Sequence, residues 1–368
     1  MKILQSSNRL QIALPIALLG AGLTISPLAA RAAQQQQPAP PPHDMNHMQH
    51  NHGGFMQEGM HHAVAKGIKL EQRVDPATHT ITVREGPLTL PAKTSHMKMP
   101  QPPDVFWTIP LDAFLLAYTP RLVDANGSAG PGIVLHHTAF WNTDRSDFLC
   151  PNKEEHIFGA GSELTNWMEL PGYGYRVQTG DKIRIETMVH NPTGTSYDKV
   201  YLEVKIPYAD STASTKGVYP TWMDVQSCGD SGYDLKPGKN ENIGTVTVKY
   251  NGILLGVGGH MHDYANQIVL EDATRKDTVA TLDARLDDKG QLLSMPVVTF
   301  FDRGGYKFSA GDQLRITATY DNTSGKPLPS GAMGIVVGYF LPSDDSAMSA
   351  LRRKPKPAAH QVAATHDM

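Results

Sequence analysis

Short segments in which apolar and polar residues alternate follow one another from about residue 66 onward. Alternation with a period of two is typical of half-buried β-strands. Gly (33 residues) and Pro (27 residues) punctuate these segments, and no window of twelve or more residues shows the 3.6-residue apolar period of a helix. Clear predicted strands include IKLEQRV, HTITVRE, DKIRIETMVH, NQIVLEDA, QLRITATYDN and MGIVVGYFLP. The pattern therefore predicts an all-β fold of sandwiches rather than an α/β sheet.

Two stretches of the chain read as copies of one another. They are GYRVQTGDKIRIETMVHN at residues 174–191 and GYKFSAGDQLRITATYDN at residues 305–322, in register throughout. A solenoid needs more than two repeats, so this pair predicts duplication of a whole domain, for which 368 residues suffice. The predicted parts are an N-terminal β-sandwich at 66–209, a connecting segment at 210–240, a C-terminal β-sandwich at 241–345 and a flexible tail at 346–368.

Residues 1–32 have the pattern of a signal peptide. Lys2 and Arg9 precede an apolar run that ends in the small residues around Ala30 and Ala32. The alternative is an uncleaved anchor, but the run is shorter than the roughly 20 residues that span a bilayer and contains two prolines. We therefore expect a periplasmic or secreted protein with no membrane span after cleavage.

The next segment, residues 33–65, has no periodic apolar face and is expected to be disordered. It is rich in histidine and methionine, whose imidazole and thioether groups suit copper in either oxidation state. These residues are His43, His47, His50, His52, His61 and His62 with Met45, Met48, Met56 and Met60. Two hypotheses stay open: the segment captures copper and delivers it to the folded domains, or it is an inert spacer.

Charge and cysteine content narrow the class of protein further. The formal net charge is −3, and it becomes −6 once the three cations of the signal peptide, Lys2, Arg9 and Arg31, are removed. Because no basic stripe occurs outside a short RRKPKP near the C-terminus, nucleic-acid binding is disfavoured. Cys150 and Cys228 are the only cysteines, and in an oxidising compartment a disulfide is favoured over a reactive thiol pair.

A histidine cluster precedes each copy of the repeat, and the second cluster is the motif His260-Met261-His262. Residues two apart on a strand share a face, so both imidazoles can reach one ion while Met261 packs on the other side. The alternative is a pair of surface histidines. Met333 opens a later strand and is the favoured third donor, because a thioether selects copper; core packing is the alternative role for a lone methionine.

The first cluster is His136-His137, in the segment IVLHHTAF. Neighbouring side chains on a regular strand point to opposite faces, so a shared ion requires a local irregularity or the use of different ring nitrogens. His190, at the end of the strand DKIRIETMVH, is the expected third ligand. Its counterpart in the second copy is Asp321, so the two predicted sites need not be alike.

In this order, the six candidate ligands resemble those of the copper type II, ascorbate-dependent monooxygenases, the family of the peptidylglycine α-hydroxylating monooxygenases and dopamine β-monooxygenase. The resemblance covers about residues 104–342. It implies two tandem jelly-roll β-sandwiches that face each other across a solvent-filled cleft, with one copper ion on each.

The resemblance also implies a role for each ligand set. His136, His137 and His190 would hold an electron-donating copper, and His260, His262 and Met333 would hold the catalytic copper that reacts with dioxygen. Ascorbate or another one-electron donor would reduce both ions, and a C–H bond of a small-molecule substrate would be hydroxylated. A copper donor protein is a further expected partner.

The chain departs from the peptide-amidating members of that family. Where those enzymes grip the substrate carboxylate, this sequence has Gly258, Ile335 and Val337. A smaller or more apolar substrate than a glycine-extended peptide is therefore expected. Candidates to line the cleft are Arg303, Tyr264 and Asp263.

Two other functions stay open. One is a non-catalytic copper carrier or copper-resistance protein, which the His/Met-rich segment would suit. The other is a zinc-dependent hydrolase or a structural zinc protein that uses the same histidines. A zinc hydrolase would need a carboxylate base near the metal, and Asp263 is the only carboxylate adjacent to the second histidine cluster.

Overall fold

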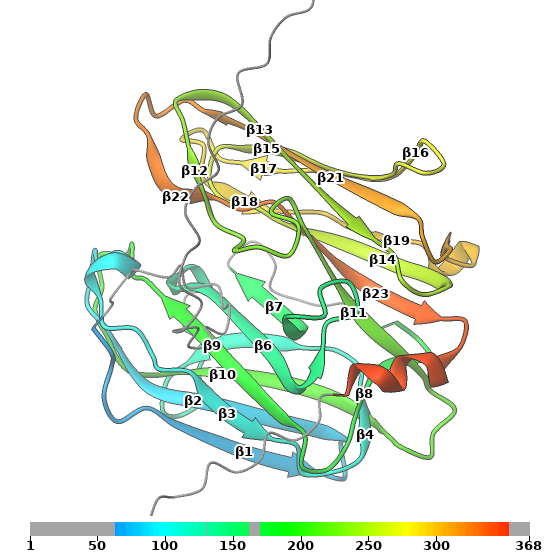
Figure 1. The fold of residues 1–368 in the computed structure, drawn as a ribbon. Coiled ribbons are helices and arrows are strands. Elements are labelled where there is room, and N and C mark those ends of the chain that lie inside the picture. The colour runs from blue at the N-terminus through cyan, green and yellow to red at the C-terminus, as the bar shows by residue number, and fades with distance from the viewer. Residues whose placement is uncertain (1–62, 131, 162–169, 353–368) are drawn as a thin grey trace, which may run out of the picture. The chain divides into compact units, whose positions relative to one another are not determined.

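The computed structural model describes residues 63–130, 132–161 and 170–352 (Figure 1). By its internal contacts the chain divides into two units, residues 1–50 and 51–368, and everything described below belongs to the second. The predicted signal peptide, nearly all of the predicted His/Met-rich segment and the chain beyond residue 352 lie outside the described residues.

The described chain consists of short β-strands and a few 3₁₀-helices. Its first half, residues 63–210, contains β1 (Lys69–Asp75), β2 (Thr80–Leu90), η1 (His96–Lys98), β3 (Val105–Thr108), β4 (Ala113–Leu115), β5 (Thr119–Val123), η2 (Gly132–Val134), β6 (Leu135–Ser146), β7 (Glu154–Gly161), β8 (Tyr173–Val177), β9 (Lys182–Val189) and β10 (Tyr197–Asp210). The prediction of an all-β protein is confirmed.

The second half, residues 211–352, continues in the same way. It contains β11 (Lys216–Asp224), β12 (Tyr233–Leu235), β13 (Gly238–Thr247), β14 (Gly252–His260), β15 (Ala265–Asp272), β16 (Asp277–Asp283), β17 (Arg285–Leu286), β18 (Leu292–Ser294), β19 (Val297–Thr299), η3 (Phe301–Arg303), β20 (Tyr306–Phe308), β21 (Gln313–Asn322), β22 (Leu328–Ala332), β23 (Ile335–Pro342) and η4 (Asp345–Leu351). Among the described residues, no helix is long and apolar enough to cross a membrane.

Each half has its own hydrophobic core, enclosed between strands of two sheets. In the first half the core joins β2 and β10 to the four-stranded sheet β3-β9-β6-β7, with Ile81, Phe140 and Ile185 almost fully buried. In the second half it joins β14 and β23 to the four-stranded sheet β13-β21-β15-β16, with Leu254 and Ile316 fully buried. The alternating pattern of the sequence produces these cores because one face of each strand turns inward.

The duplicated stretches fold in the same way down to single hydrogen bonds. Each forms a strand, a tight turn and a second strand, and the turn glycines, Gly180 and Gly311, have φ angles of 90° and 98°. In the first copy the Asp181 carboxylate accepts a hydrogen bond from the backbone N–H three residues earlier at 2.9 Å, and Asp312 does the same at 2.7 Å in the second. A positive φ favours glycine, so the sequence identity at these positions has a conformational cause.

The predicted connecting segment, residues 210–240, contains β11, β12 and the start of β13. One of them, β11, pairs in parallel with β8 of the first half and antiparallel with β23 of the second, so one sheet runs through both halves. The expected disulfide is present: Cys150 is bonded to Cys228, with their Cα atoms 5.6 Å apart. Phe148, Leu149 and Cys150 of the first half are buried in the second core.

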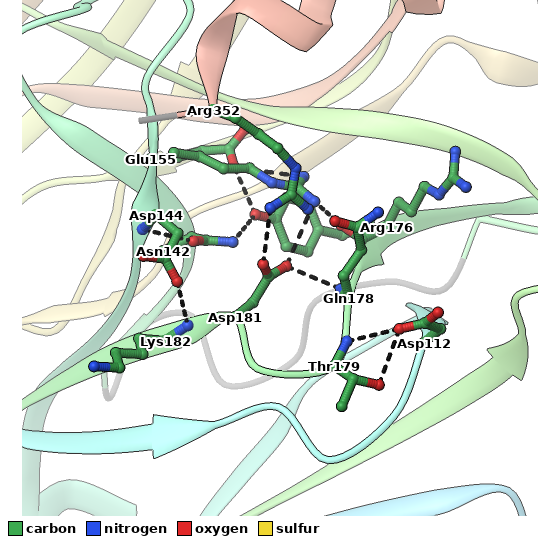
Figure 2. A network of polar contacts seen from close by, with 12 residues as sticks. Asp112, Asn142, Asp144, Glu155, Arg176, Gln178, Thr179, Asp181, Lys182 and Arg352 are labelled. Atoms are coloured by element: carbon green, nitrogen blue, oxygen red, sulfur yellow. Dashed lines mark hydrogen bonds and ion pairs between the residues drawn. The ribbon is translucent and has the colours of Figure 1, made fainter. Parts of the chain in front are cut away.

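The flexible tail predicted from residue 346 does not begin there. Residues 345–351 form η4, in which Met348 and Leu351 are buried in the second core. Arg352 then bonds the Asp181 carboxylate at 3.1 Å, within a polar network of the first half (Figure 2). Burial of these two apolar side chains and the Arg352 ion pair hold η4 against the rest of the described chain.

Candidate metal centre

The pair His136-His137 lies at the start of β6. Its pairing with β9 changes register between Leu135 and His137, which is a β-bulge. A bulge removes the strict alternation of side chains, so the two rings approach: their Nδ1 atoms are 3.0 Å apart and the ring centroids 4.9 Å. The local irregularity that a shared ion requires is therefore present.

His190 follows β9 directly and packs on His136, with the ring centroids 5.0 Å apart. Its Nε2 lies 2.6 Å from the carbonyl oxygen of Ile133. A carbonyl can only accept, so Nε2 carries the hydrogen and Nδ1 keeps the lone pair. A backbone partner of this kind orients a histidine toward a metal and fixes its tautomer.

A fourth histidine, His96, joins these two residues from the short helix η1. Its ring centroid is 4.7 Å from that of His136. Three ring nitrogens, one from each of His96, His136 and His190, lie within 4.8 Å of one another. This spacing can hold a metal ion. His137 contacts this group through His136. The structure thus brings His136 and His190 together as expected and adds a ligand that was not predicted.

Gln101 explains why the His96 segment lies here. Its buried amide nitrogen donates to the carbonyls of His96 and Val189 at 2.9 and 3.0 Å, and its oxygen accepts from the Val189 N–H at 2.9 Å. Thr94 and Asn191 exchange two backbone hydrogen bonds of 2.8 Å beside it. The segment that carries His96 is therefore tied to the chain on both sides of His190.

The second cluster adjoins the first. His260 ends β14, Met261 is buried in the second core as predicted, and the rings of His260 and His262 lie 5.4 Å apart. The ring centroid of His262 is 6.1 Å from that of His136. The resemblance implied two sites that face each other across a cleft, whereas the described residues place all six histidines in one histidine cluster, defined as His96, His136, His137, His190, His260 and His262.

Burial within this cluster keeps its central imidazoles neutral. It lowers the pKa of His136 and His137 well below the usual value, and the neighbouring histidines lower the pKa further. Burial also lowers the pKa of His190, opposed by its bond to the Ile133 carbonyl and by the charge of Asp263. A neutral imidazole has the lone pair that a metal ion needs.

Met333 is the remaining predicted ligand. The hydroxyl group of Tyr320 connects its backbone to that of His262. The Tyr320 Oη atom accepts hydrogen bonds from the backbone N–H groups of His262 and Met333 at 3.1 and 3.2 Å, and it donates to the Met333 carbonyl. The Met333 side chain is buried with Ile335, Val337 and Trp222. Ile335 and Val337, two of the three positions at which the peptide-amidating enzymes are expected to grip a carboxylate, are thus part of an apolar cluster here.

The three residues proposed to line a cleft have structural contacts. Asp263 accepts a hydrogen bond from the Leu292 N–H at 2.8 Å, and the Arg303 guanidinium stacks 5.0 Å from the Phe300 ring centroid. Tyr264 has a φ of 66° and its ring packs against Gly290, where a Cβ would lie 2.6 Å away.

Comparison with known proteins points to copper. The chain is 26% identical over 234 residues to a Phoma sp. protein named "Probable copper-dependent oxygenase M1", and the match covers 57% of this chain and 58% of that protein. It is also 26% identical over 234 residues to "Probable copper-dependent oxygenase clz3" of Cochliobolus lunatus, covering 57% of this chain and 72% of that protein. The chain therefore spans less than two thirds of the first of these relatives, and no family model matches it.

Solved structures give weaker similarities. N-glycanase F superimposes with a TM-score of 0.36 at 9% identity, covering 72% of this chain and 96% of that one. The major capsid protein P2 of bacteriophage PM2 gives 0.30 at 10% identity, covering 72% and 98%. At these TM-scores neither similarity supports a conclusion about this chain.

Two histidines, one in the cluster and one beside it, were not predicted from the sequence. His96 stands alone in the segment TSHMKM, where no periodicity or second histidine marks it. His156 lies on β7, between Trp141 and Trp222 at ring-centroid distances of 4.4 and 3.9 Å. Burial lowers its pKa well below the usual value, and Arg184 and His260 lower the pKa further. Neither shows a spacing to other histidines that could have signalled its position.

Proposed function

We propose that this protein is a copper-dependent oxygenase, and specifically a monooxygenase that hydroxylates a C–H bond of a small, apolar substrate with dioxygen. The observation that carries the proposal is the histidine cluster, in which six imidazoles from both halves converge. The two relatives named as copper-dependent oxygenases support it. We further propose ascorbate or another one-electron donor as the reductant, and a content of two copper ions per chain.

The donor set fits copper. Imidazole nitrogens bind copper well, and a thioether favours its reduced form. His96, His136 and His190 would hold one ion, with His137 against it; His260, His262 and Met333 would hold the other. When bound, copper would supply one-electron redox chemistry toward dioxygen.

The chain's own residues would orient the ligands and shape the site. The Ile133 carbonyl holds the His190 ring with Nδ1 as the lone-pair nitrogen, and burial keeps His136 and His137 neutral. Ile335 and Val337 are buried and uncharged, so they favour an apolar substrate over a carboxylate. We also propose that the two halves, at 66–209 and 241–345, have tandem jelly-roll connectivity. A periplasmic or secreted location is a further part of the proposal, and the disulfide supports it.

The test is copper content and oxygen consumption of a chain that begins at Lys66 and lacks the His/Met-rich segment. We expect two coppers per chain by elemental analysis, one after His260→Ala, and ascorbate-dependent oxygen uptake by the loaded protein. Two tightly bound coppers with no oxygen uptake across a panel of apolar substrates would instead support a copper carrier. Zinc retained in place of copper would contradict the proposal.

His96 provides a separate check on the ligand assignment. His96→Ala should weaken copper binding at the first set by more than about 10-fold, because one of three imidazoles is lost. The measurement is a competition titration with a copper chelator in the His260→Ala background, which leaves the first set alone. His79→Ala is the matched control, since His79 is half exposed and pairs with Asp210. Equal affinities for His96→Ala and the control would remove His96 from the site.

A further inference from the structure

A small pocket lies beside the disulfide. It has a volume of about 30 Å³, and its lining includes Trp141, Trp222, His156 and Asp147. A space of about 10–15 Å³ holds one water, so this pocket has room for a small polar head group. None of its lining residues belongs to the histidine cluster or to the six predicted ligands.

The pocket is built on a rigid turn. The Asp147 Oδ1 atom accepts hydrogen bonds from the backbone N–H groups of Leu149 and Cys150 at 2.8 and 2.7 Å, and the Asp147 N–H donates to the Lys153 carbonyl at 3.1 Å. Cys150 is in turn bonded to Cys228, another lining residue. These covalent and hydrogen bonds fix the Asp147 side chain before any ligand arrives.

The second oxygen of Asp147 is the unusual atom of this pocket. The side chain is 2% exposed, and within the described chain its buried Oδ2 atom has no hydrogen-bond partner. Burial raises the pKa of Asp147 to about 6, against the opposing effects of the two backbone bonds and the charge of Lys249. A buried acceptor without a donor destabilises the folded protein, and a ligand carrying N–H donors would offset that cost.

The rest of the lining selects the charge of such a ligand. Lys153 lies 3.7 Å from Asp230, and Glu154 lies 3.0 Å from Arg184, so these side chains are paired and leave Asp147 as the acidic group to be matched. The Arg184 guanidinium already lies 5.2 Å from the Trp141 ring centroid, and Trp222, whose centroid is 5.9 Å from that of Trp141, adds a second aromatic face that attracts organic cations. A metal ion would gain less from this lining, because indole carbon supplies no ligand atom.

We propose that this pocket binds the ammonium head of an organic amine, with the Asp147 Oδ2 atom as acceptor and Trp141 and Trp222 as the aromatic wall. No residue of this binding site is a proposed copper ligand, although Trp222 packs beside Met333, and the binding does not depend on the proposed oxygenase activity. The apolar body of the amine would extend out of the pocket along the indole faces.

The probe is benzylammonium, compared with neutral benzyl alcohol, by isothermal titration calorimetry on the full secreted chain. We expect saturable binding of benzylammonium that Asp147→Asn weakens by about 10-fold or more, because a charge-assisted hydrogen bond is lost. Any binding of benzyl alcohol should change less than about 2-fold, since the amide keeps the shape of the carboxyl. Asp210→Asn, an exposed carboxylate paired with His79, is the matched control and should change neither.

Several results would overturn the proposal. Absence of benzylammonium binding would do so, as would equal weakening of both probes by Asp147→Asn or no effect on either. Should Asp147→Asn fail to fold, Trp222→Leu takes its place, with an expected loss of about 3-fold or more in benzylammonium affinity from the missing cation–π contact. Unchanged affinity in that variant would also reject the site. Calorimetry before and after copper loading separates this outcome from failure of the oxygenase proposal.

Discussion

The hydroxyl of Tyr320 joins the two segments expected to carry the second metal site. It bonds the backbone of His262 and, through both the N–H and the carbonyl, that of Met333. Tyr320 is fully buried, and burial raises its pKa well above the usual value, so the phenol keeps its proton. One side chain thus fixes the separation of two candidate ligands that are far apart in the sequence.

Tyr320→Phe tests this function. Removing the hydroxyl leaves three buried backbone groups without their partner, so we expect a loss of about 1–3 kcal/mol in the free energy of unfolding, measured by urea denaturation. Copper affinity of the second set should fall as well. Tyr306→Phe is the matched control, because its hydroxyl bonds Asp277 near the surface, and its loss should cost less than about 1 kcal/mol. Equal effects of the two variants would contradict the assignment.

A second buried residue, Glu85, should make the free energy of unfolding depend on pH. Burial raises its pKa to about 7, opposed by a 2.7 Å hydrogen bond from Thr187 Oγ1 and aided by the charge of Asp104. Between the unfolded pKa near 4.5 and about 7, the folded state therefore binds more protons than the unfolded state. Stability must then fall as the pH rises through this window.

Glu85→Gln should remove that component. At pH 4.5 the variant and the parent protein should differ little, whereas at pH 8 the variant should gain up to about 3 kcal/mol relative to the parent, from a pKa shift of about 2.5. Urea denaturation at both pH values is the measurement. Glu71→Gln, at an exposed position on β1, is the control. A constant difference across the pH range would show that Glu85 is ionised in the folded protein.

At the scale of elements, each copy of the duplicated strand-turn-strand unit ends in an asparagine whose side chain makes the same kinds of hydrogen bond. Asn191 bonds two carbonyls at 2.8–2.9 Å and accepts from Thr193, and Asn322 does the same with Ser324, at 2.8 and 3.2 Å to its two carbonyls. Only Asn191 also has a backbone bridge to Thr94 near His96. The two copies therefore share their fold but differ in what they position.

Asn191→Ala and Asn322→Ala form a matched pair. Each should lower the free energy of unfolding by about 1–3 kcal/mol, since two buried or partly buried carbonyls lose their donor. In the His260→Ala background, only Asn191→Ala should also weaken copper binding, because its side-chain bond to the Leu90 carbonyl anchors the chain that leads to Thr94 and His96, while the backbone bridge to Thr94 remains. A chelator competition titration measures this difference, and equal copper affinity in both variants would contradict it.

At the scale of the whole described chain, the connections between the halves include a shared strand, a disulfide and an ion pair. β11 pairs with strands of both, the Cys150–Cys228 bond closes a loop of 78 residues, and Arg352 bonds Asp181 of the first half. Figure 2 shows the last of these within a network that includes Glu155 and Asn142. These connections keep histidines from both halves in one cluster.

The disulfide contribution can be measured directly. Replacing Cys150 and Cys228 together by serine should lower the free energy of unfolding by about 4 kcal/mol, because the unfolded chain regains the entropy of a loop of this length. Addition of reductant to the parent protein should give a similar shift in urea. A change below about 1 kcal/mol in either experiment would show that other contacts hold the two segments.

Local periodicity determined much of this protein. Alternation of apolar residues and frequent turns predict an all-β chain with a duplicated unit, and the structure contains both. Two cysteines in a chain expected to be exported predict the disulfide. The pairs His136-His137 and His260-x-His262 are visible as motifs because their members are close in the sequence. The strands, turns and histidine motifs depend on neighbouring residues alone, so sequence is sufficient to find them, and two cysteines in the whole sequence allow a single intramolecular pairing.

Tertiary structure alone decided how those parts meet. His96 joins His136 and His190 only because Gln101 and Asn191 tie its segment to the end of β9. The two predicted ligand sets merge into one cluster because β11 is a strand shared by both halves rather than a linker. Contacts between residues far apart in the sequence depend on strand pairing and packing, which leave no local pattern to read.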